Sequence, residues 1–207
     1  MGEWFPRLYD TVMKPLERRK FKQIRTKLVE QATGRVLEIG SGTGANFPHY
    51  SNAVSVEAIE PNPVMRERSY KNRLESAAPI QVWSAHAEEL PFQDNTFDSI
   101  VATLVFCTIP DPLQALEEIR RVAKPGAAIL LFEHVRVNQA VMEKAQDILT
   151  PVWKHLCDGC HLNRDTLATV KQAGIRISSV ESFYKGVFIT VIGNTGTRRQ
   201  APCPDSR

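Results

Sequence analysis

The stretch that most constrains this chain is residues 35–46, where an apolar strand runs directly into a loop with glycine at positions 40, 42 and 44. Glycine allows backbone torsions that other residues avoid, and it lets the main chain approach a ligand closely. A second apolar strand follows at 54–59 and leads to Glu60. An acidic residue there is placed to accept hydrogen bonds from both hydroxyls of a ribose. We therefore predict a strand–loop–strand unit that binds a nucleotide.

Two cofactor classes share this layout, and the glycines alone do not separate them. Gly40, Gly42 and Ala45 fit the dinucleotide pattern G-x-G-x-x-G/A. Glu38 and the three loop glycines instead fit E-x-G-x-G-x-G, the pattern of a loop that binds S-adenosylmethionine. The second interpretation gives Glu38 a task, because a charge inside an apolar strand is costly without a hydrogen-bonding partner. That carboxylate would accept from loop amides or face the cofactor ammonium.

The length and composition limit the remaining classes. A chain of 207 residues, 43% hydrophobic and 24% charged, predicts one domain with a full-sized core and leaves little room for a second nucleotide-binding half. No signal peptide and no run of about eighteen apolar residues is seen. The four cysteines are unevenly spaced, so we expect a reduced, cytoplasmic protein. A net charge of +3 is too small to predict a nucleic-acid partner.

From residue 34 onward, strand-like and helix-like segments alternate as in a parallel sheet. Strands are expected at 36–39, 54–59, 80–84, 97–105 and 127–132, and helices between them at 64–77 and 113–123. The pattern then loosens, with 138–149 helical, 151–161 irregular and 163–173 helical. The last strands, 175–183 and 187–192, are joined by a turn too short for a parallel crossover, so the sheet should end in an antiparallel hairpin.

Residues 1–33 are expected to form a helical lid ahead of the domain at 34–194, and residues 195–207 a disordered tail. Aromatic and apolar residues recur at helical spacing from Trp4, and a basic run extends from Arg18 to Lys27. The basic face is interpreted as solvated, with peripheral contact to anionic lipid as the alternative. The aromatic first turn would cover the cofactor.

Taken together, these residues resemble a small class I S-adenosylmethionine-dependent methyltransferase. The match runs from the glycine loop through Glu60, residues 88–92, Phe97-Asp98 and Lys124-Pro125-Gly126 to the closing hairpin. The resemblance implies one Rossmann-like α/β domain, with a seven-stranded, mostly parallel sheet that has one antiparallel strand and helices on both faces. It also implies these cofactor-binding residues: Glu38, Gly40, Ser41, Gly42, Gly44, Asn46, Glu60, Pro61, His86, Ala87, Glu88 and Thr103.

Shorter strings at 44–47, 103–107, 133–135 and 158–166 are similar to membrane-associated thiol methyltransferases. Those relatives carry an N-terminal hydrophobic anchor, and no such apolar run is seen here. Quinone-biosynthesis methyltransferases are also similar, but they have an aspartate where this chain has His86. The adenine contact would then come from a neutral histidine nitrogen or from the backbone at 87–88.

The sequence predicts the methyl acceptor less directly than it predicts the cofactor. Methyl transfer from a sulfonium is an in-line displacement in which the protein chiefly positions and desolvates the reactants. A thiol is partly ionised at neutral pH and needs no dedicated base, whereas a phenol or quinol does. We predict a small-molecule acceptor, first a hydrophobic thiol; the alternatives are O-, C- or N-methylation of a quinol, phenol or lipid amine, or a non-catalytic cofactor-binding domain. Candidate catalytic residues are Tyr9, His134 and Asp158.

The string Cys157-Asp158-Gly159-Cys160-His161 has the spacing of a haem-attachment motif. No export signal and no second ligand pair accompany it, so we expect no metal and a packing role in a loop that faces the substrate. Cys107, at the end of a buried strand, is expected to act as a small apolar residue.

Overall fold

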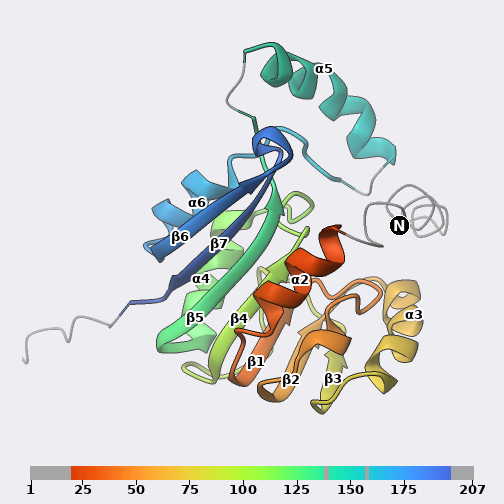
Figure 1. The fold of residues 1–207 in the computed structure, drawn as a ribbon, viewed down its shortest axis with the longest axis vertical. Helices are drawn as coiled ribbons and strands as arrows, with labels where there is room; N and C mark the ends of the chain where they lie inside the picture. Colours follow the sequence, from red (N-terminus) through yellow and green to blue (C-terminus); the bar gives the residue numbers. More distant parts are fainter. Residues whose placement is uncertain (1–19, 138–139, 157–158, 197–207) are drawn as a thin grey trace, which may run out of the picture.

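The computed structural model of the chain describes residues 20–137, 140–156 and 159–196. Within them, seven strands form one sheet in the order β3-β2-β1-β4-β5-β7-β6 (Figure 1). Strand β7 runs antiparallel to both of its neighbours, and every other adjacent pair is parallel. The predicted sheet, with one antiparallel strand and a closing hairpin, is confirmed.

The strands are β1 (Gly34–Ile39), β2 (Ala53–Ile59), β3 (Ile80–Trp83), β4 (Phe97–Thr103), β5 (Ala123–His134), β6 (Arg176–Phe183) and β7 (Phe188–Asn194). The helices are α2 (Lys22–Val29), α3 (Pro63–Leu74), α4 (Pro112–Val122), α5 (Ala140–Leu156) and α6 (Thr166–Gln172). Two 3₁₀ turns are η2 (Phe47–His49) and η3 (Tyr184–Gly186). Helices α3 and α4 begin as the sequence predicts, because Asn62 and Asp111 each cap two backbone N–H groups ahead of a proline.

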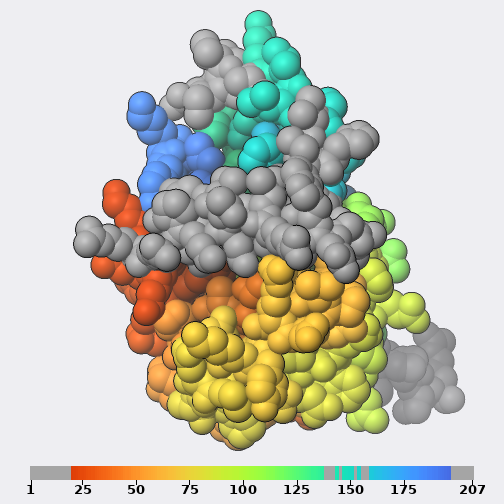
Figure 2. All heavy atoms as spheres, turned by 90° about the vertical axis from the view of Figure 1, so that its right-hand side faces the viewer, coloured from red at the N-terminus to blue at the C-terminus, as the bar shows by residue number. Residues whose placement is uncertain are grey.

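Helices cover both faces of the sheet (Figure 1). Successive strand residues point to opposite faces, so Val36 belongs to the core beneath α2, and Leu37 to the core that includes α4. Before α2, Phe21 packs edge-on against Phe132 and Phe188, with ring centroids 5.2 and 4.8 Å apart. Both views place α3 and α5 at opposite ends of the molecule (Figures 1 and 2).

The parallel pairing brings the loops after β1, β2 and β4 to one edge of the sheet, because β1 lies between β2 and β4. At the opposite edge, the Asp98 carboxylate accepts from Arg35 N at 2.9 Å and from Lys124 Nζ at 2.6 Å. That contact joins the starts of β1, β4 and β5. The Phe97-Asp98 and Lys124-Pro125-Gly126 strings therefore serve the scaffold, on the side away from the glycine loop.

Several predicted bounds are wrong, and contacts in the structure explain three of them. Residues expected to be irregular from 151 onward are helical as far as Leu156, although Pro151 lies inside α5. The neighbouring Thr150 hydroxyl donates to the carbonyl of Gln146 at 2.6 Å, which adds a bond beside the one that proline removes. Strand β5 begins at 123 rather than 127, because its first residue pairs with β4 ahead of a bulge.

The third correction concerns the start of the tail. Thr195 N donates to the carbonyl of Ala127 at 3.1 Å, and the Thr195 hydroxyl donates to the carbonyl of Lys124 at 2.8 Å. The chain therefore stays attached to the sheet as far as Gly196, whose carbonyl accepts from Gly126 N. Residues 197–207 lie outside the described residues, and so do residues 1–19, which make up most of the helical lid expected at 1–33.

Candidate active site

The glycine loop after β1 depends on glycine at each of its three positions. Gly40, Gly42 and Gly44 have φ values of 63°, 54° and 76°, a region that L side chains rarely adopt. A Cβ on Gly40 would lie 2.2 Å from Val105 Cγ2, so the loop after β4 packs directly on this backbone. A Cβ on Gly42 would meet no atom of the described residues within 4 Å. No described residue therefore fills the space on one side of Gly42, as a ligand cradle requires.

Glu60 is directed at this loop. Its Oε2 accepts from Gly42 N at 2.9 Å, and its Oε1 accepts from Asn62 N at 2.8 Å. Only 8% of the Glu60 residue is exposed. Beside it, Pro61 contributes its carbonyl to Arg66, which also binds the carbonyl of Glu60. The strand end expected to hold a ribose thus meets the loop expected to hold the rest of the ligand.

Glu38 lies in a buried polar network beneath the loop. Its Oε1 accepts from Asn46 Nδ2 at 2.9 Å, and its Oε2 accepts from the Tyr50 hydroxyl at 2.7 Å. Asn46 also donates to Thr103 Oγ1 at 3.0 Å. Burial raises the pKa of Glu38 to about 7, and the hydrogen bonds from Tyr50 and Asn46 oppose that shift. The expected partners were loop amides or a ligand, whereas the structure shows two side chains.

Arg25 of α2 completes the network and was not predicted. Its guanidinium donates to Asn46 Oδ1 at 3.0 Å and to Thr103 Oγ1, and only 4% of the residue is exposed. The expectation of a uniformly solvated basic face is therefore wrong at this position. The signal was present in the sequence, because Arg25 shares a helical face with Phe21 and Leu28.

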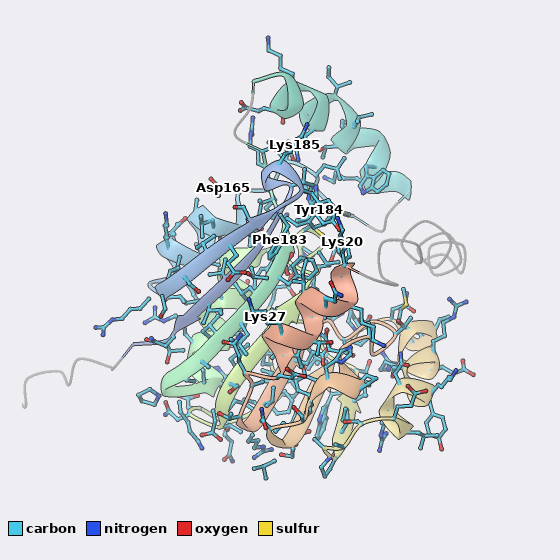
Figure 3. The ribbon with its side chains drawn as sticks, in the orientation of Figure 1. Lys20, Lys27, Asp165, Phe183, Tyr184 and Lys185 are labelled. Atoms are coloured by element: carbon cyan, nitrogen blue, oxygen red, sulfur yellow. The ribbon has the colours of Figure 1, made fainter. Side chains whose placement is uncertain are left out.

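The other basic residues described on this segment lie at the surface. Lys20 Nζ lies 5.5 Å from the centroid of the Tyr184 ring, and both residues can be followed in Figure 3. Lys27 lies 3.9 Å from Glu181 in a solvent-exposed ion pair. Such contacts contribute little to stability. They place part of the basic face against the β6–β7 hairpin.

The predicted adenine segment follows β3 in the chain and contacts the start of α4. His86 is exposed and bridges to Glu89, whereas Ala87 is buried. Glu88 Oε1 accepts from Asp111 N at 3.3 Å, and its carbonyl accepts from Gln114 Nε2 at 3.1 Å. A cavity of about 380 Å³ at this point is lined by Glu88 and α4 residues, without any residue of the glycine loop. The Glu88 side chain thus anchors the segment to α4.

The turn after β4 contains a residue that sequence reasoning missed. Leu104 has φ 55°, so β4 ends at Thr103, earlier than expected. That conformation costs roughly 1–2 kcal/mol for a side chain with a Cβ. It presents Val105 N and Phe106 N to Glu133 Oε1, at 3.1 and 3.3 Å. Burial raises the pKa of Glu133 to about 8, and its Oε2 has no partner among the described residues.

Of the three candidate catalytic residues, His134 lies within the described residues. His134 packs its ring against Phe188, with centroids 5.4 Å apart, and burial lowers its pKa to about 4. Tyr9 and Asp158 lie outside the described residues. Ser41 is buried, with a backbone N–H bonded to Ile59 O and a hydroxyl that has no partner in the described chain. A catalytic role for Tyr9, His134 or Asp158 stays a prediction, and so does cofactor binding by Ser41.

Two further findings cover residues 20–137, 140–156 and 159–196. No group of three or more histidine, cysteine, aspartate or glutamate side chains in these ranges could hold a metal ion. No helix in them is long and apolar enough to cross a bilayer.

A sheet of this order, with a glycine cradle after β1 and an acidic residue closing β2, defines the class of Rossmann-like methyltransferases. A methyltransferase-domain family model matches residues 37–132. Thiol S-methyltransferase TMT1B of Rattus norvegicus is 32% identical over 183 residues, which cover 82% of this chain and 74% of the relative. The chain therefore belongs to the S-adenosylmethionine-dependent methyltransferases, in the family that includes this TMT1B, and S-adenosylmethionine is its methyl donor.

Two other similarities are weaker. Phosphatidylethanolamine N-methyltransferase of Cereibacter sphaeroides is 34% identical over 119 residues, covering 54% of this chain and 58% of the relative. A solved S-adenosylmethionine-dependent methyltransferase from Aquifex aeolicus has a TM-score of 0.63 at 20% identity, covering 92% of this chain and 98% of that one. This last likeness concerns the fold alone.

Proposed function

We propose that this methyltransferase transfers the methyl group to the sulfur of a small hydrophobic thiol. The observation that carries the proposal is the similarity to TMT1B, which extends over most of both chains. It includes the segments after β4 and before α6, on the side of the sheet where an acceptor would approach. The acceptor atom itself rests on this similarity.

The glycine loop fits the cofactor for two reasons. No described residue fills the space on one side of Gly42, and the Glu60 carboxylate is hydrogen-bonded to Gly42 N beside that space. We infer that Glu60 accepts from the ribose hydroxyls while it holds Gly42 N. Arg25, Asn46 and Thr103 would orient the methionine end, since they form a buried polar surface beneath the loop. The segment at 86–88 would lie beside the adenine.

When bound, S-adenosylmethionine supplies a methyl group on a positively charged sulfur that a nucleophile can attack in line. The protein must hold the acceptor opposite that bond and exclude water. A thiol near its ordinary pKa of about 8.5 already provides some thiolate at neutral pH. His134 packs on Phe188, and burial lowers its pKa to about 4, so its imidazole accepts a proton weakly. This is compatible with a reaction that needs no histidine base.

Methylation of a lipid amine is the second candidate. It is favoured by the similarity to phosphatidylethanolamine N-methyltransferase, although that match covers 58% of the relative. We also propose that the protein is cytoplasmic and that its basic N-terminal segment makes peripheral contact with anionic lipid. Sedimentation with phosphatidylserine vesicles tests the lipid contact; a protein that stays in the supernatant at low salt would contradict it.

The acceptor is tested with S-adenosylmethionine labelled in its methyl carbon and offered with an alkyl thiol, a hydroquinone or phosphatidylethanolamine. The proposal predicts label in a methyl thioether. Label found only on oxygen, ring carbon or nitrogen would reject S-methylation. Tight binding of the cofactor without product from any acceptor would indicate a non-catalytic role.

A further inference from the structure

Two cysteines far apart in the sequence meet beside the turn after β4. Cys107 is 4% exposed, and Cys160 is half-buried in the segment between α5 and α6. Their segments are joined, because His161 N donates to the carbonyl of Cys107 at 2.8 Å. The two side chains lie close enough for each thiol to shift the pKa of the other. The described structure thus brings two free thiols from separate segments next to each other.

Arg164 fixes this arrangement from the side of α6. Its guanidinium donates to the carbonyls of Phe106 and Ile109 at 2.5 Å each, on both sides of Cys107 in the chain. The positive charge of Arg164 also acts on both sulfurs. The two cysteines are therefore held together by contacts that do not depend on the thiols themselves.

The environments of the two sulfurs differ in a way that separates their roles. The neighbouring Cys107 thiol lowers the pKa of Cys160, and Trp153 and Arg164 act in the same direction, whereas burial opposes them. The Cys160 thiol and burial raise the pKa of Cys107, and Arg164 opposes that shift. Cys160 is the more exposed and more easily ionised thiol, whereas Cys107 is the buried one. A reactive thiol beside a second thiol is the arrangement found in redox-sensing pairs.

We propose that Cys107 and Cys160 form a reversible disulfide when the protein meets a peroxide. The Cys160 thiolate attacks one peroxide oxygen, the O–O bond breaks, and hydroxide leaves to give a sulfenic acid on Cys160. The Cys107 sulfur then attacks the Cys160 sulfur, the S–O bond breaks, and the thiol proton leaves with the oxygen as water. Two thiols and one peroxide thus give one disulfide and two waters, and a dithiol reductant reverses the change.

The disulfide would act on the cofactor site through Val105. Two sulfurs that are not yet bonded must approach to about 2.05 Å to form a disulfide, so one of the two segments has to move. Val105 Cγ2 packs against the backbone of Gly40, and Val105 N is held by Glu133. Movement of this turn therefore reaches the glycine loop. We expect the oxidised protein to bind S-adenosylhomocysteine, the demethylated cofactor, several-fold more weakly, whichever acceptor the enzyme uses.

The test is peptide mapping after treatment of the full chain with stoichiometric hydrogen peroxide. The proposal predicts a mass lower by about 2 Da and a linked peptide pair containing Cys107 and Cys160, both removed by dithiothreitol. The same link should form in a Cys157→Ser, Cys203→Ser background, which removes the other two cysteines. In Cys107→Ser, a dione reagent should trap a sulfenic acid on Cys160.

Two results in the unaltered protein would overturn the proposal: a link between Cys157 and Cys160, or over-oxidation of Cys160 without any link. Both can be observed even if the variants fail to fold. Titration of S-adenosylhomocysteine into oxidised, reduced and re-reduced protein tests the consequence. A several-fold loss of affinity that reductant restores supports it, and equal affinity in all three states rejects it. Neither result depends on which acceptor is methylated, so it does not decide the proposed function.

Discussion

Glu60 Oε2 lies 2.9 Å from the backbone nitrogen of Gly42, which joins the end of β2 to the loop after β1. The same carboxylate binds Asn62 N, the cap of α3. One side chain therefore fixes three consecutive parts of the proposed cofactor-binding unit. Substitutions at this point should weaken both the fold and ligand binding.

The open side of Gly42 gives a first prediction. Gly42→Ala should cost roughly 1–2 kcal/mol of stability, because alanine disfavours φ 54°. It should also weaken S-adenosylhomocysteine binding by more than about tenfold, since the new methyl group enters the proposed ligand space. Gly126→Ala is the matched control, with φ 81° and an equally open Cβ position at the opposite edge of the sheet. Equal affinities of the two variants in calorimetry would contradict the placement of the ligand.

A second prediction concerns Thr103, whose hydroxyl accepts from both Arg25 and Asn46. Thr103→Val keeps the shape but leaves buried donors without this acceptor, so the free energy of unfolding should fall by about 1–3 kcal/mol. Urea denaturation measures the change. Thr96→Val, which removes one surface hydroxyl bonded to Gln93 O, should cost less than half as much. Similar losses in both variants would mean that the buried network contributes little.

Glu133 gives a third prediction about the turn after β4. Glu133→Gln keeps an acceptor for Val105 N and Phe106 N, whereas Glu133→Ala leaves both amides unpaired. Alanine should therefore destabilise the fold by about 1–3 kcal/mol more than glutamine does. Hydrogen exchange at these two amides should accelerate only in the alanine variant. Unchanged exchange there would show that the carboxylate does not hold the turn.

The pH dependence of stability gives a fourth prediction. The pKa values of Glu38 and Glu133 are raised by burial to about 7 and about 8, so both carboxyls hold a proton more tightly in the folded chain. Stability should therefore fall as the pH rises from about 4.5 to about 8. The lowered pKa of His134 gives the opposite slope, a loss of stability as the pH falls from about 6.5 to about 4.

Paired urea titrations separate these slopes. Glu133→Gln should remove part of the decline toward pH 8, because the variant no longer has a proton to lose. Glu117→Gln removes the same charge from an exposed position on α4 and should leave the slope as it is in the unaltered protein. A decline that persists in Glu133→Gln would place its cause in other groups.

The fold was largely predictable because its signals are local. Alternating strands and helices, the Asn62 and Asp111 caps and the short turn before β7 each specify one element, and parallel pairing then limits the sheet order. The errors arose where tertiary contacts override local preference. Pro151 remains inside a helix, and Thr195 is retained by hydrogen bonds to Lys124 and Ala127.

The site was predictable where one residue carries the signal. Glu38 stood out as a charge in an apolar strand, and Glu60 by its position after β2. The network around Glu38 was not predictable, because Asn46, Tyr50, Thr103 and Arg25 come together only in the folded chain. The proximity of Cys107 and Cys160 is of the same kind, since no periodicity links the turn after β4 to the segment before α6.

The most direct test of the account is calorimetric titration of S-adenosylhomocysteine into Glu60→Gln and Glu57→Gln. Glu57 lies on the same strand and binds Arg35 and Trp83. We expect Glu60→Gln to weaken binding by about 10- to 100-fold, the loss of one or two charge-assisted hydrogen bonds. The free energy of unfolding should fall by about 1–3 kcal/mol, because the glutamine amide leaves one of the two backbone N–H groups without its acceptor. Glu57→Gln should bind like the unaltered protein. Undiminished binding by Glu60→Gln would contradict the claim that this carboxylate holds the ribose.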